Sequence, residues 1–72
     1  MAAQVAGRMY VEGEFTDREG ERNAAQRLMR ELDDAAAREG MKVIGDVAIA
    51  ASETSLFAVP RTMRLEADVV PR

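Results

Sequence analysis

Apolar and polar residues alternate along three stretches of the chain, and a longer stretch with helical spacing separates the first from the other two. Between Val5 and Phe15 the odd positions are apolar or glycine, and the even positions are mostly polar. A period of two predicts a strand with one covered face. The same period returns over Lys42–Ala51 and over Thr62–Val70. The pattern therefore predicts three strands.

The segment Thr16–Gly40 predicts a single helix. Thr16 and Glu19 have the spacing of a capping box, and Gly40 stands where a left-handed residue often ends a helix. Between these ends, apolar residues recur at steps of three and four and form one stripe, which consists of Ala24, Ala25, Leu28, Met29, Leu32, Ala35 and Ala36. Such a stripe is typical of a helix that packs on a sheet. Because much of the stripe is alanine, we expect the helix to lie close to the strands.

These elements predict one small α+β domain that spans residues 1–72. Their order is β-α-β-β, and we expect a three-stranded, mostly antiparallel sheet with the helix packed on one face. The last two strands form a hairpin through the connection Ser52–Arg61. One helix covers only one face of the sheet, so the other face stays open in a single copy of the chain.

The open face is less polar than a face that meets water normally is. Its charged ends flank a patch formed by Tyr10, Ile44, Ala48 and Ala50. Tyrosine combines apolar area with a polar tip and is frequent at interfaces. We therefore expect this patch to be an interface with another protein surface.

Two large apolar residues, Leu56 and Phe57, lie in the connection between the last two strands. They either fold back on the core or fill a pocket elsewhere, and we count them among the predicted interface residues.

The small size of the chain favours self-association. A chain of 72 residues buries only about 60% of the surface that its unfolded form exposes, so its own core is marginal. Such domains usually add disulfides, a metal or a second copy. The chain contains no cysteine and no histidine. We therefore expect a homo-oligomer.

The residues available for catalysis are few. Ser52 and Ser55 lie in a plausible loop, but the chain has no histidine to activate them, and no glycine-rich phosphate loop is present. We expect a protein that is not an enzyme and that has no catalytic residue and no cofactor. An alternative stays open, in which Arg8, Tyr10 and Arg64 hold an anion or a planar ring in a pocket between subunits.

Glu12 and Glu14 lie two residues apart on the open face, and clustered carboxylates are the ligands that hard cations prefer. Arg8, Lys42 and Arg64 share that face, so cross-strand charge pairing explains the same carboxylates. We therefore expect no metal site.

The charge and hydropathy exclude further classes of partner. The net charge is −3, and acidic and basic residues are mixed, so the clustered positive surface of a nucleic-acid-binding protein is missing. No apolar run approaches the roughly 20 residues that span a bilayer, and the first residues do not form a secretory signal. We expect a cytoplasmic protein without a nucleic-acid or membrane partner.

These patterns together lead to a functional expectation. Arginine outnumbers lysine strongly and alanine is abundant, which indicates a GC-rich coding genome of a bacterium or of a phage that grows in one. The expected function is that of a non-enzymatic, self-associating protein that acts through protein–protein contact, as a small bacterial or phage accessory or structural factor.

The order of the elements and the total length resemble the dodecins, small strand–helix–strand–strand proteins that form hollow dodecamers and bind flavins. Dodecins stack the flavin ring on a tryptophan just after the helix. Here the corresponding segment is Glu39-Gly40-Met41-Lys42-Val43, and the chain has no tryptophan. The resemblance therefore implies assembly through strand contacts and does not imply flavin binding.

Overall fold

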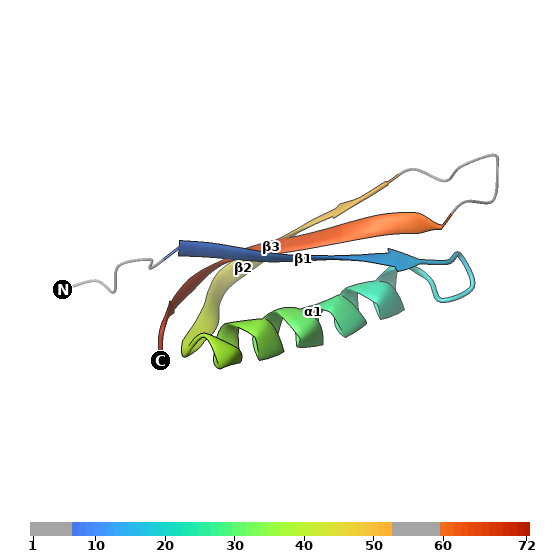
Figure 1. The fold of residues 1–72 in the computed structure, drawn as a ribbon. Coiled ribbons are helices and arrows are strands. Elements are labelled where there is room, and N and C mark those ends of the chain that lie inside the picture. Colours follow the sequence, from blue (N-terminus) through green and yellow to red (C-terminus); the bar gives the residue numbers. More distant parts are fainter. Residues whose placement is uncertain (1–6, 53–59) are drawn as a thin grey trace.

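The computed structural model describes residues 7–52 and 60–72. They form β1 (Gly7–Phe15), α1 (Glu21–Arg38), β2 (Met41–Ala51) and β3 (Arg61–Pro71), as Figure 1 shows. The predicted β-α-β-β order and α+β class are confirmed. The predicted interface residues Leu56 and Phe57 lie outside the described residues.

β3 is the central strand of the sheet. The strand order is β1-β3-β2, and both outer strands pair with β3 in the antiparallel sense. β1 and β2 are therefore parallel to each other and are the two edges of the sheet. The helix lies across one face (Figure 1), and the other face is open.

The core lies between α1 and the inner face of the sheet. Its buried residues are Phe15, Ala24, Leu28, Leu32, Met63, Leu65 and Ala67. At Gly13 of β1, an added Cβ atom would lie 2.7 Å from the Cδ2 atom of Leu28, so the absence of a side chain there makes room for Leu28.

The helix begins later than predicted. The hydroxyl of Thr16 accepts a hydrogen bond from the backbone N–H of Glu19 at 3.2 Å, but residues 17–19 form a turn and α1 starts at Glu21. Gly20 is the N-cap, with a φ of 85° that no helical residue adopts. The predicted start at Thr16 is therefore wrong, because the capping-box pattern closes a turn that Gly20 separates from the helix.

The carboxylate of Glu19 binds Arg27 rather than the backbone of Thr16. Arg27 donates to both oxygens of Glu19, with Nε at 3.0 Å and Nη2 at 3.1 Å, and Nη2 also donates to the carbonyl of Glu14 at 2.9 Å. These hydrogen bonds hold the pKa of Glu19 below its ordinary value of 4.5. The pair joins the end of β1 to the second turn of the helix.

The other end of the helix is as predicted. α1 ends at Arg38, and Gly40 follows with a φ of 72° and donates its N–H to the carbonyl of Ala37 at 3.0 Å. The carbonyl of Gly40 in turn accepts from the N–H of Arg72 at 2.9 Å, so the end of the helix is tied to the end of β3.

Arg61 fastens the opposite end of the sheet. Its Nη2 donates to Glu21 of α1 at 2.7 Å, and its Nε donates to the carbonyl of Ser52 at 2.9 Å. The guanidinium also lies 5.0 Å from the centre of the Phe15 ring. One partly buried side chain thus connects the ends of β1 and β2 with the start of the helix.

Candidate functional site: the open face and the β2 edge

The open face of the sheet carries the residues for which the sequence predicts an interface. Tyr10 lies on β1 opposite Glu66, and Ala48 on β2 lies opposite the same Glu66. Ile44 lies opposite Asp68, and Ala50 lies opposite Arg64. The charged residues of β3 therefore separate Tyr10 from the three apolar residues of β2. The predicted patch has two parts rather than one.

The part over β1 and β3 is a network of ion pairs. Arg8 lies 3.0 Å from Asp68 and 3.4 Å from Glu66, and Arg64 lies 3.1 Å from Glu12. Arg64 also lies 3.7 Å from Glu66. All these side chains are partly exposed, so each pair contributes only about 0.2–1 kcal/mol to stability. Cross-strand pairing accounts for Glu12, Glu66 and Asp68 on this face.

The structure brings Arg8, Tyr10 and Arg64, the residues of the ligand-binding alternative, onto one face. The Arg64 guanidinium lies 4.0 Å from the centre of the Tyr10 ring, which is an attractive cation–π geometry. Both arginines donate to carboxylates, and one face of the Tyr10 ring is already covered. An incoming anion or planar ring would have to displace these contacts.

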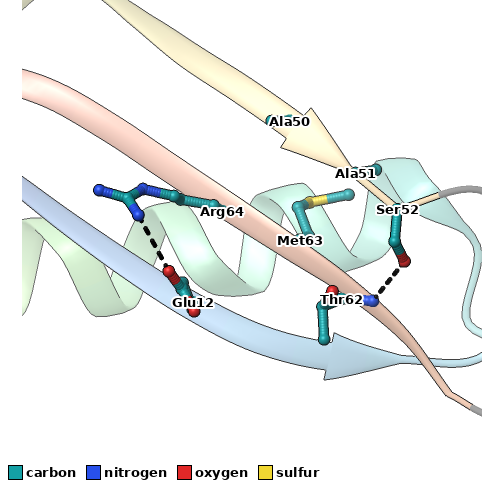
Figure 2. A pocket seen from close by; sticks show the side chains of 7 residues that line it. All are labelled: Glu12, Ala50, Ala51, Ser52, Thr62, Met63 and Arg64. Carbon is teal, nitrogen blue, oxygen red and sulfur yellow. Dashed lines mark hydrogen bonds and ion pairs between the residues drawn. The ribbon is translucent and has the colours of Figure 1, made fainter.

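The part over β2 consists of three apolar residues, Ile44, Ala48 and Ala50. Ile44 is half-buried, and Ala48 and Ala50 are exposed. A shallow hollow of about 300 Å³ lies at the far end of this part, where Figure 2 shows Glu12 facing Arg64 and the hydroxyl of Ser52 accepting a hydrogen bond from the N–H of Thr62. Glu12 and Arg64 line one side of this hollow, and the methyl groups of Ala50 and Ala51 line the other.

The inner face of β2 is less covered than the alternation predicts. Ile49 points to the helix side, since it lies opposite the buried Leu65, yet 55% of its surface is exposed. It lines an open groove of about 500 Å³ whose other wall is the first turns of α1, with Glu21, Arg22 and Ala25. The alternation over Lys42–Ala51 places Ile49 on the face opposite Ala48 and Ala50, where the helix was expected to cover it.

A signal for this groove was present in the sequence. β2 has apolar residues at both odd and even positions, whereas a strand on one covered face needs them at one parity only. The exposure of Ile49 itself depends on where the helix lies, which the strand pattern does not specify.

β2 also contains a bulge. The register against β3 jumps between Ile44 and Ala48, and Gly45 has a φ of 69° there. A bulge in an edge strand bends it and interrupts pairing with another strand. Lys42 and Asp46, both exposed, lie in this first half of β2. Beyond the bulge, from Ala48 to Ala51, the strand is regular and has no charged residue.

Within residues 7–52 and 60–72, no cluster of three or more potential metal ligands occurs. Over the same described ranges, no helix is both long and apolar enough to cross a membrane.

No protein-family model, no curated protein and no solved structure matches the chain. The function is therefore argued from the geometry of the sheet.

Proposed function

We propose that this protein is a non-enzymatic, self-associating protein that acts through protein–protein contact, with β2 as its contact strand. The observation that carries the proposal is the set of apolar side chains at one edge of the sheet. Ile44, Ala48 and Ala50 lie on its open face, and Ile49 lies exposed on the other.

The contrast with β1 supports this choice of strand. The even positions of β1 are charged or aromatic, and Arg8, Tyr10 and Glu12 all contact side chains of β3 or pack with them. Their interactions are satisfied within one copy of the chain. Burial of apolar surface is worth roughly 25 cal/mol per Å², so a partner that covers β2 gains this free energy without having to break the ion pairs that β1 makes with β3.

The residue inventory supports a non-enzymatic role. The chain has no histidine or cysteine, and the carboxylates of Glu12 and Asp68 accept hydrogen bonds from arginines. A small accessory or structural factor of a bacterium or phage fits this inventory.

Size-exclusion chromatography with light scattering, over a range of protein concentrations, tests the proposal. We expect a mass above the 7.9 kDa of one chain at high micromolar concentration. Ala50→Glu should lower the mass toward that of a monomer, because it places a charge in the contact. Ile44→Glu tests how far the contact extends along β2, since Ile44 lies on the other side of the bulge. Ala50 is exposed, so its replacement leaves the fold intact even where the change at the half-buried Ile44 disturbs it.

Ala37→Glu is the matched control, since it makes the same change as Ala50→Glu at an exposed position near the end of α1, and Ala37 does not line the groove beside Ile49. It should leave the mass unchanged. A strict monomer of the unmodified protein at high micromolar concentration would refute the proposal.

A further inference from the structure

We propose that the partner of β2 is the β2 strand of a second copy, which pairs with it edge to edge and antiparallel about a two-fold axis at Ala50. The two sheets then form one continuous sheet. This inference rests on the proposed self-association and specifies its geometry.

The position of the apolar side chains points to the edge rather than to either face. Ala48 and Ala50 are exposed on the open side, and Ile49 is exposed on the helix side of the same segment. A layer packed on the open face would leave Ile49 in water, and a segment in the helix-side groove would leave the alanines in water. A strand beside the edge covers both sets. It also pairs with the outward backbone groups of β2, which has β3 on one side only within the described sheet.

Only one segment of the two edges is suited to such pairing. β1 carries the charged residues Arg8, Glu12 and Glu14 on its open side. The first half of β2 contains the bulge at Gly45. Charged side chains and bulges are the features that prevent edge-to-edge pairing in natural sheets. The segment from Ala48 to Ser52 has neither feature.

The register follows from the faces. Opposite residues in an antiparallel pair share a face, so the two-fold axis must lie at a residue. An axis at Ala50 uses the whole segment from Ala48 to Ser52 and keeps the bulge outside it. It places Ile49 of each copy opposite Ala51 of the other on the helix side, so that a large side chain meets a small one. On the open side, Ala50 meets Ala50 and Ala48 meets Ser52.

The paired segment is short, so the dimer should be weak. Stable interfaces bury about 1,200–2,000 Å² in total, and a single short strand pairing with a polar rim lies at the low end of that range or below it. We expect a dimer whose population depends on concentration in the micromolar range.

Single-cysteine cross-linking tests the register, because the chain contains no cysteine of its own. Opposite residues in an antiparallel pair have Cα atoms about 4.5–5.5 Å apart, within the range of about 4.4–6.8 Å that a disulfide spans. Under mild oxidation Ala50→Cys should form a disulfide-linked dimer that a reductant reverses. A mixture of Ile49→Cys and Ala51→Cys should form a mixed dimer.

Ala48→Cys is the matched control, since it is exposed on the same strand and the same face. In the proposed register, residue 48 of one copy and residue 48 of the other lie four residues apart along the strands, which is about 13 Å. No disulfide forms over this distance. A monomer by light scattering would overturn both this inference and the proposed function. A dimer in which Ala48→Cys or Ile44→Cys cross-links as readily as Ala50→Cys would overturn the register and leave self-association standing.

Discussion

β1 and β2 flank the same central strand, but the side chains of β1 make more contacts within one copy of the chain than the residues near the end of β2 do. On its open side, β1 has charged residues that pair with β3, and on its inner side Gly13 and Phe15 are packed tightly against the core. β2 has alanines and an isoleucine on its open side, and on its inner side Ile49 is 55% exposed. The ion pairs thus belong to β1, and the end of β2 near Ile49 is the part of the sheet that the helix leaves open, whereas Val43 and Val47 of β2 pack against the core.

The row through Leu65 shows the same difference at a single position. Val11 of β1 and Ile49 of β2 lie on opposite sides of this buried residue. Val11 packs against the core cluster, whereas the larger Ile49 borders an open groove. Position relative to the helix, rather than hydrophobicity, determines which of the two is buried.

The largest expected effect comes from a change at the close contact between β1 and α1. Gly13→Val should lower the free energy of unfolding by about 1–3 kcal/mol, because a Cβ atom there meets the fully buried Leu28 and the core must shift. Denaturant unfolding followed by circular dichroism measures the change.

Gly7→Val provides the control on the same strand and the same parity. Among residues 7–52 and 60–72, no atom lies within 4 Å of a Cβ atom added at Gly7, so we expect no loss of stability. Equal losses at both glycines would show that strand conformation, and not the contact with Leu28, makes Gly13 necessary.

A second comparison concerns Val11 and Ile49, which lie opposite Leu65 on its two sides. Val11→Ala should cost about 1 kcal/mol, since it removes partly buried methyl groups that touch the core. Ile49→Ala should cost less than about 0.5 kcal/mol in a dilute, monomeric sample although it removes more carbon atoms, because Ile49 is largely exposed there. Thermal and denaturant melts at low protein concentration measure both.

At high protein concentration the relative size of these two stability losses should change. If β2 is the contact strand, Ile49→Ala should also weaken the oligomer, whereas Val11→Ala should not. A larger loss for Ile49→Ala in the dilute sample would mean that β2 is as well packed as β1 within the monomer.

The smallest effect is a pH dependence at the end of β1. Arg27 lowers the pKa of Glu19 in the folded chain, so the ionised carboxylate stabilises the fold. This contribution is complete above the ordinary glutamate value of 4.5 and is lost as the pH falls through the lower folded pKa. Stability should therefore decrease on acidification below that value.

Glu19→Gln isolates this group. The variant should be less stable than the unmodified chain at neutral pH, and the difference should shrink as the pH falls. A difference that stays constant down to the acid limit would contradict the assignment of the shift to the Glu19–Arg27 pair. Melting temperatures measured over a pH series provide the comparison.

The sequence predicts most of the fold because its periods are local. The alternation over β1, β2 and β3 assigns each residue to a face, and Gly40 ends the helix by its own backbone preference. The start of the helix was predicted too early. A Thr and a Glu three residues apart occur in turns as well as at helix starts, and here Gly20 separates the turn at Thr16–Glu19 from the helix.

The candidate site was predicted only in part. Ile44, Ala48 and Ala50 do lie on the open face, but the charged residues of β3 separate them from Tyr10. The strand order β1-β3-β2 determines this separation. That order depends on which strands pair in the folded chain, and the sequence pattern does not specify it. The exposure of Ile49 was missed for a related reason. It depends on where the first turns of α1 lie relative to β2, which the strand pattern does not contain.

The sequence by itself determined the types of the elements, their order and the two faces of each strand, because these depend on periods of two and of three to four residues along the chain. The tertiary structure decided which strand is central, which edge has its charges paired and which apolar side chains stay in water. Those properties depend on distances between residues far apart in the sequence, such as Glu12 to Arg64 or Gly13 to Leu28, and no local pattern contains them.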